Sequence, residues 1–128
     1  MKMGWQPRKW LDKKSKLPFR GYPAGTVAFY GPDDQRASKV AASVIVAEGT
    51  EPVELRRWFA ESGDVRSDAA IVEEVALFLR GHEVRTVVMA LNLMMGCPHE
   101  EGIDYPEGEA CPQCPFWAGR DRPILVPW

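Results

Sequence analysis

The feature that most constrains this chain is a group of three cysteines and one histidine near its C-terminus. Cys97 and His99 are two positions apart, Cys111 and Cys114 are three positions apart, and a glycine- and proline-containing segment separates the two pairs. Each short spacing lets a single turn direct two side chains at one point, and the segment between them can fold back to join the pairs. Three thiolates and one imidazole are donors typical of tetrahedral zinc. The sequence therefore predicts a zinc site at these four residues.

The number and placement of the cysteines favour a metal site over disulfides. The chain has three cysteines, an odd number, and all of them belong to this group. Small secreted proteins that depend on disulfides normally carry an even number. The N-terminal residues lack the apolar stretch of a secretion signal, and the apolar runs are too short to span a bilayer. These features predict a cytoplasmic protein that does not contact membranes.

The C-terminal segment that holds the cysteines has no helical or strand periodicity. It is rich in proline and glycine from residue 94 onward, and such a long irregular stretch is uncommon in a compact domain unless something local organises it. A structural zinc ion contributes about 10 kcal/mol of folding free energy. We therefore expect the zinc to organise a loop over residues 96–117, with four protein ligands that close the site to catalysis.

Other chemistries of the same segment remain open alternatives. A zinc-dependent hydrolase would use Glu100 or Glu101 as its general base and would leave one of the four ligand positions open for water. A nucleobase deaminase also has a His-x-Glu and a later Cys-x-x-Cys, but residues 102–110 are too few for the helix and strand that separate these motifs. A redox Cys-x-x-Cys pair requires a helix N-terminus, and Pro115 gives only a weak one. These comparisons favour a binding role over an enzymatic one.

The preceding part of the chain predicts a small α+β domain. Strands are expected at residues 26–30, 38–47 and 53–59, where the last places Val53, Leu55 and Phe59 on one face. The alanines of residues 38–47 leave a helix possible there. Short connections between the three strands suggest an antiparallel meander.

A helix and a fourth strand follow the meander. Ser67 and Asp68 can cap a helix whose apolar stripe includes Ile71, Val75 and Phe78 and which ends at Gly81. An apolar strand over residues 85–93 would enter the sheet by a helical crossover. The predicted fold is thus a small sheet of about four strands, in the order strand, strand, strand, helix, strand, with one covering helix and a C-terminal zinc-bound loop.

The N-terminal segment differs from the rest of the chain in charge. Residues 1–20 carry seven basic side chains and one acidic one, whereas the whole chain has a net charge of −2. We interpret residues 1–25 as a basic arm or linker that precedes one zinc-binding domain over residues 26–128. Basic residues interleaved with aromatic ones can bind phosphates and stack on bases, and we expect Arg120 and Arg122 to extend such a patch. The candidate nucleic-acid-binding residues are Arg8, Lys9, Lys13, Lys14, Lys16 and Arg20. The alternatives are a solubilising tail, or docking of the arm on the chain's own acidic body or on an acidic protein partner.

Several motifs resemble those of a family of uncharacterised bacterial proteins. They are Tyr30-Gly31-Pro32-Asp33-Asp34 with Ala37-Ser38-Lys39-Val40, the stretch from Cys97 to Pro106, and the stretch from Cys111 to Trp117. The resemblance covers roughly residues 18–122 and implies domain limits but no activity. Taken together, the sequence predicts a zinc-stabilised binding module for nucleic acid or a protein partner, with the zinc hydrolase as the alternative.

Overall fold

The computed structural model describes residues 5–127 of the chain; residues 1–4 of the predicted arm and Trp128 of the predicted domain lie outside this range. The elements in chain order are α1 (Pro7–Lys16), β1 (Ala24–Tyr30), β2 (Lys39–Ile45), β3 (Glu54–Phe59), η1 (Val65–Ser67), α2 (Ala69–Gly81), β4 (Thr86–Met94), η2 (Pro115–Trp117) and β5 (Ile124–Leu125). None of the helices in this range is long and apolar enough to cross a membrane.

The strands form one mixed sheet in the order β3-β2-β1-β4-β5. β1, β2 and β3 pair antiparallel, β4 pairs parallel to β1, and β5 pairs antiparallel to β4. This arrangement confirms the predicted α+β class, with a meander followed by a helix and a parallel strand. The fifth strand is an addition: β5 has two residues, too few to carry a periodic signal.

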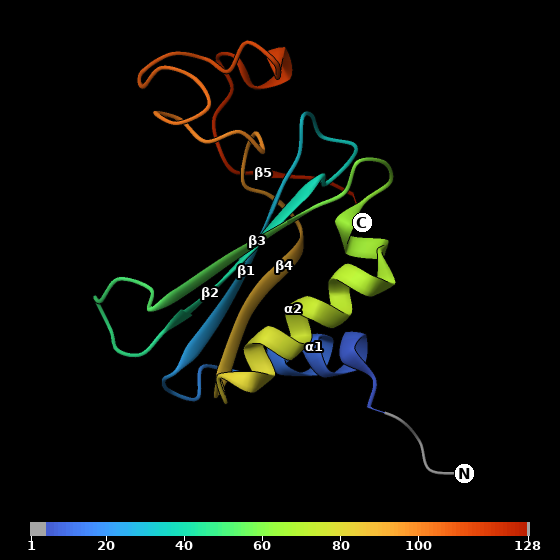
Figure 1. Cartoon of the computed structure of the whole chain (residues 1–128), viewed down its shortest axis with the longest axis vertical. Helices are drawn as coiled ribbons and strands as arrows, with labels where there is room; N and C mark the ends of the chain where they lie inside the picture. The colour runs from blue at the N-terminus through green and yellow to red at the C-terminus, as the bar shows by residue number, and fades with distance from the viewer. Residues whose placement is uncertain (1–4, 128) are drawn as a thin grey trace.

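Helices α1 and α2 lie side by side on one face of the sheet (Figure 1). The side chain of Asp68 accepts hydrogen bonds from the N–H groups of Ala70 and Ile71, so it caps α2 as the sequence predicts. Leu79 of α2 packs so close to Gly25 of β1 that a Cβ atom there would lie 2.7 Å from the leucine side chain. The core lies between the helices and this face of the sheet, and its residues include Leu11, Val27, Phe29, Val40, Val44, Val75, Leu79 and Val87.

Within the segment predicted to be an arm or linker, residues 7–16 form helix α1. Leu11 is its one buried residue, so the helix lacks the apolar stripe by which α2 is recognised. Polar contacts fasten it to the rest of the protein: Arg8 donates a hydrogen bond to the carbonyl oxygen of Arg66, and Lys14 Nζ donates to the carbonyl oxygen of Val84 at 3.2 Å. The segment is therefore part of the folded body over these residues.

Strand β3 directs the side chains of Leu55 and Phe59 away from the helices. Val53, Leu55 and Phe59 share a face, as predicted, but they are 52%, 47% and 61% exposed. The register explains this, because β3 pairs Leu55 with Ser43 and Phe59 with Lys39 on the face of β2 opposite helices α1 and α2 (Figure 1). Trp58 points to the helices instead, where its Nε1–H donates to Glu74 at 3.1 Å.

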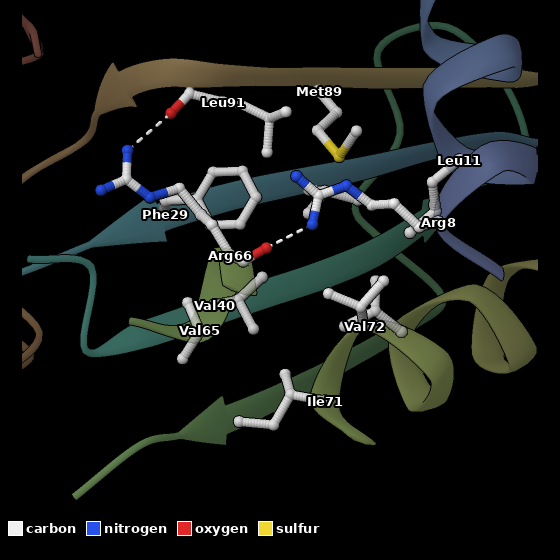
Figure 2. A pocket seen from close by; sticks show the side chains of 12 residues that line it. Arg8, Leu11, Phe29, Val40, Val65, Arg66, Ile71, Val72, Met89 and Leu91 are labelled. Carbon is white, nitrogen blue, oxygen red and sulfur yellow. Dashed lines mark hydrogen bonds between the residues drawn. The ribbon is translucent and has the colours of Figure 1, made fainter. Parts of the chain in front are cut away.

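A buried arginine donates a hydrogen bond to the backbone at an irregularity between β1 and β4. Val27 pairs with Met89, but two residues later Phe29 pairs with Met94, so several residues of β4 leave the ladder. Arg66 Nη1 donates to the carbonyl oxygen of Leu91 in this bulge at 2.8 Å (Figure 2), while two other nitrogens of its guanidinium bind Asp64. The apolar cavity beside Arg66 measures about 20 Å³, room for about one water molecule. This cavity is too small to be a ligand site.

Candidate metal centre

The first ligand pair is fixed to the end of the sheet. Beyond β4, the N–H of Met95 donates to the carbonyl oxygen of Phe29, and the N–H of Gly31 donates to the carbonyl oxygen of Gly96. Gly31 permits this close packing, since a Cβ atom there would lie 1.9 Å from the carbonyl oxygen of Arg36. Cys97 and His99 thus emerge from a segment held by the last residues of β1.

The second ligand pair is tied to the same place. The N–H of Cys114 donates to the carbonyl oxygen of Cys111, which closes the turn between them, and η2 follows directly. Trp117 of η2 is 2% exposed, and its Nε1–H donates to the carbonyl oxygen of Gly31 at 2.7 Å. Gly31 therefore links both halves of the loop to β1.

Acidic side chains organise the segment between the two pairs. The N–H of Glu100 donates to Asp104 Oδ2 at 2.7 Å, and the N–H of Gly108 donates to Glu101 Oε2 at 2.6 Å. These bonds fold residues 100–108 into compact turns. Two of the acids near the cluster, Glu101 and Asp104, are thereby engaged by loop backbone.

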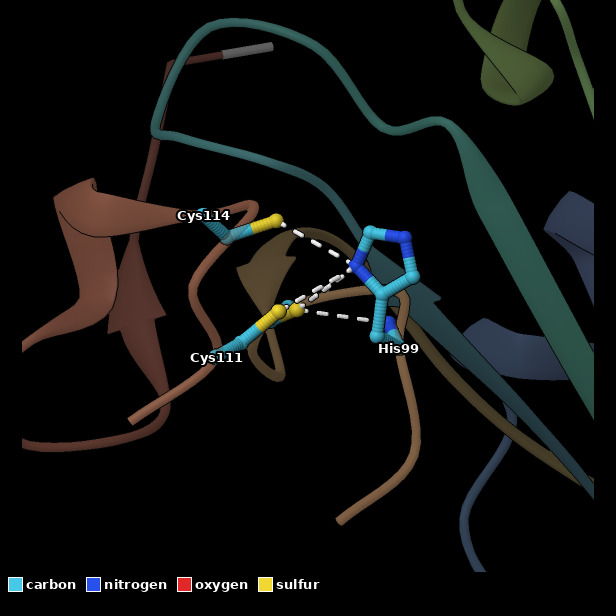
Figure 3. Close-up of side chains that lie close together, drawn as sticks. His99, Cys111 and Cys114 are labelled. Atoms are coloured by element: carbon cyan, nitrogen blue, oxygen red, sulfur yellow. Dashed lines mark hydrogen bonds between the residues drawn. The ribbon is translucent and has the colours of Figure 1, made fainter. Parts of the chain in front are cut away.

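The four predicted ligands come together. The Sγ atoms of Cys97, Cys111 and Cys114 and a ring nitrogen of His99 lie within 4.8 Å of one another. His99 Nδ1 is 3.3 Å from the sulfur of Cys97 and 3.5 Å from each of the other two sulfurs (Figure 3). One ring nitrogen cannot donate a hydrogen to three sulfurs at once, whereas zinc bound tetrahedrally at ordinary ligand distances places nitrogen and sulfur about 3.5 Å apart. The donor set and its spacing fit a metal ion.

The electrostatics of the three thiols point the same way. Burial raises the pKa of Cys97 and of Cys114 above the ordinary value, and interactions with the neighbouring cysteines raise that of Cys114 further. Three buried thiolates would repel one another without a cation. A divalent metal ion lowers the pKa of its thiol ligands, because it binds their deprotonated form, and its charge offsets the repulsion between the thiolates.

Two basic residues of the sheet hold Glu100, the residue next to His99. Arg57 Nε lies 2.7 Å and Lys39 Nζ 3.3 Å from Glu100 Oε2. Lys39 also donates to the carbonyl oxygen of Pro98 at 3.0 Å, and its side chain is 4% exposed. The sequence analysis predicted no role for either basic residue. A lysine at the start of an otherwise apolar strand is the signal that would have indicated Lys39.

The candidate nucleic-acid-binding residues divide into two sets. Arg8 and Lys14 are partly buried and bind backbone carbonyls, as described above, whereas Lys9, Lys13, Lys16 and Arg20 are exposed. Helix α1 and the metal loop lie at opposite ends of the molecule (Figure 1). Arg120 and Arg122, which stack on Phe116 and Trp117 at the loop, therefore do not extend the basic patch, and that expectation was wrong.

Comparison of the chain with protein-family models, with curated proteins and with solved structures finds no match. The resemblance to a bacterial family stays a prediction. The functional argument therefore depends on the site itself.

Proposed function

We propose that this protein is a zinc-stabilised binding module in which the zinc is structural. The observation that carries the proposal is the convergence of three cysteine sulfurs and His99 Nδ1 within 4.8 Å. Four protein donors satisfy tetrahedral zinc and leave no position for a reacting water. The loop they join, residues 96–117, has few buried residues of its own, so the ion supplies the cross-link that the loop otherwise lacks.

Metal removal tests the structural role. Hydrogen exchange of the backbone amides is measured on the zinc-loaded chain before and after a chelator is added. We expect the amides of residues 96–117 to lose protection and the midpoint of thermal unfolding to fall. His99→Ala is expected to reproduce the effect, whereas His82→Ala, at the exposed end of α2, serves as the matched control. Metal loss without any change in exchange or unfolding would refute a structural zinc.

The zinc hydrolase alternative has weaker support. Glu100 forms ion pairs with Lys39 and Arg57, so its carboxylate is already engaged by two cationic side chains of the sheet. Glu101 accepts a hydrogen bond from Gly108. The observation that supports the hydrolase alternative is a hollow of about 280 Å³ beside His99. Cobalt substitution separates the two roles: a visible spectrum of a four-coordinate Cys3His site that is unaffected by added anions fits a closed centre, and one that changes fits an open centre.

The exposed lysines of α1 favour nucleic acid as one partner of the module. Lys9, Lys13 and Lys16 follow one another at helical spacings of four and three residues, so they share one side of α1. Such a row can neutralise phosphates along a backbone. We expect a short DNA duplex to shift in a native gel at low salt, and the triple change of these lysines to glutamate to abolish the shift. Arg120→Glu at the opposite end is the control, and unchanged binding by the triple variant would refute this role.

A further inference from the structure

The face of the sheet opposite α1 and α2 has the features of a docking surface. Among residues 5–127 both α-helices lie on the other face (Figure 1). Residues paired across strands share a face, so the register defines the rows of side chains that point outward. One row, read from β3 to β4, is Leu55, Ser43, Thr26 and Val88. The hydrogen bond between the hydroxyls of Thr26 and Ser43 confirms that these two side chains lie together.

The outward rows form a trough. In the two middle rows the central strands carry the small side chains of Thr26, Ala28, Ala41 and Ser43. Larger apolar side chains stand at the margins: Leu55 is 47% and Val88 is 58% exposed. A hollow of about 370 Å³ follows the β1 and β4 side of this floor and is lined by residues that include Ala28, Val88, Ala90 and Leu93. Four adjacent strands span about 14 Å, and an α-helix with its side chains is about 10–12 Å wide. The trough therefore has the width of one helix.

The alternation of β3 is inverted for a strand whose outer face meets water. Two of its three outward residues, Leu55 and Phe59, are apolar, and Arg57 lies between them. Glu54 and Arg56 alternate on the side of the helices, where the guanidinium of Arg56 stacks on the rings of Trp58 and Phe78. Antiparallel sheets with one solvated face normally place polar residues outward. Exposed apolar clusters of this kind mark interaction sites.

The charges at the ends of the trough indicate the chemistry of its occupant. Strands β1–β4 place two charged side chains on this face, and both form ion pairs with Glu100. Lys39 is 4% exposed, so Arg57, at 38%, is the one of the two that a partner can reach. At the other end, the backbone N–H of Arg20 donates to Thr86 Oγ1 at 2.9 Å, which brings a further exposed basic residue beside the face. A second copy of the same face fits poorly, because two concave surfaces leave a gap and would bring basic groups together. A convex occupant with acidic groups fits both the shape and the charge.

We propose that this trough, with Leu55 and Val88 at its margins, binds an amphipathic α-helix of a partner protein whose apolar side covers the rows and whose acidic residues lie near Arg57 and Arg20. The proposal rests on the proposed binding function and names the class of partner. Helix-in-groove recognition uses apolar anchors on one side of the helix. Here the exposed leucine and valine supply the complementary walls.

The test uses a synthetic peptide of about 18 residues, long enough for a helix of about 27 Å, with leucines on one side and glutamates on the other. It is titrated into the isotope-labelled, zinc-loaded full chain while amide NMR shifts are followed. We expect saturable shifts at Thr26, Ala28, Ser43, Leu55 and Val88. A peptide with lysines in place of the glutamates is expected to bind at least about tenfold more weakly.

Two variants locate the site. Leu55→Glu or Val88→Glu is expected to weaken binding at least about tenfold, whereas Leu77→Glu on the exposed side of α2 is the matched control and leaves it unchanged. Both sites are exposed, so the variants retain the dispersed spectrum of the folded chain. No saturable shift at millimolar peptide, shifts confined to α1 or α2, or a concentration-dependent dimer that Leu55→Glu dissociates would each overturn the proposal. Zinc is counted in the same sample beforehand, so a zinc-loaded chain that fails to bind refutes the helix partner and leaves the structural zinc standing.

Discussion

At the residue scale, Asp64 and Arg66 show how a buried charge serves the fold. The Arg66 side chain is 1% exposed, and Asp64 both neutralises it and accepts the N–H of Ala37. Burial acts to raise the pKa of Asp64, but its hydrogen bonds with the Arg66 side chain and with the backbone of Ala37 and Arg66 outweigh burial, so the pKa is lowered. This pair lets Arg66 reach the carbonyl of Leu91 in the β4 bulge.

Replacing Asp64 should therefore destabilise the protein strongly. Asp64→Asn leaves Arg66 buried without its carboxylate, which costs about 3 kcal/mol in the free energy of unfolding. Urea unfolding at neutral pH measures this, with the exposed Asp121→Asn as control. A cost no larger than that of the control would contradict the role assigned to the pair.

The same substitution predicts a pH effect with a defined sign. Because the native pKa of Asp64 is below its unfolded value of about 3.9, its contribution is complete above that value and is lost as pH falls through the native pKa. The difference in stability between the parent chain and Asp64→Asn should shrink as the pH falls below about 4. Metal release in acid affects both chains, so their difference isolates Asp64. A constant difference would contradict the assignment.

Gly31 makes a second prediction at this scale. A methyl group at this position would meet the carbonyl oxygen of Arg36 at 1.9 Å, and backbone cannot move aside cheaply. Gly31→Ala should cost about 1–3 kcal/mol and should loosen the metal loop, because Gly31 binds both Gly96 and Trp117. Gly81→Ala, with open space around it, is the control. Thermal unfolding together with zinc affinity checks the result, and equal behaviour of the two variants would refute it.

At the scale of elements, the sequence predicted those segments whose side chains repeat with a clear period. Helix α2 and strands β1, β2 and β4 were found within a few residues of their bounds because each has an apolar face over several residues. Helix α1 has one buried residue among charged ones, and β5 has two residues, so neither carries a pattern. The sequence predicted the group of four candidate ligands because donor chemistry and spacing do not depend on periodicity.

The outward face of β3 was a different case. Period two shows that Val53, Leu55 and Phe59 share a face but does not say which face the helices cover. The direction depends on pairing with β2, which is tertiary information. The roles of Lys39 and Arg57 toward Glu100 were missed for the same reason, since 43 residues or more separate the partners in sequence.

Helix α1 gives the prediction at the element scale. Leu11 is 3% exposed and is the one buried residue of this helix, beside the partly buried Trp10. Leu11→Ala should cost about 2–4 kcal/mol and should raise hydrogen exchange in α1 well before the sheet opens. Leu77→Ala, at an exposed position of α2, is the comparison. An α1 that stays protected in Leu11→Ala would show that the polar contacts of Arg8 and Lys14 suffice.

At the scale of the whole molecule, the basic helix, the candidate metal loop of residues 96–117 and the outer sheet face occupy different parts of the surface. Helix α1 presents basic residues at one end, the metal loop lies at the other, and the uncovered face of the sheet runs between them (Figure 1). The loop has little core of its own and is joined to the sheet through Gly31, Lys39 and Trp117. From the proposed metal centre we expect the integrity of that whole end to depend on the four candidate ligands acting together around one ion.

The metal content of the purified protein tests this account most directly. The chain is prepared without chelators, and its zinc is quantified and then removed while unfolding is followed. We predict one zinc per chain, retained through purification and lost together with the structure of residues 96–117. Protein that folds with the same stability and holds no metal would contradict the central claim.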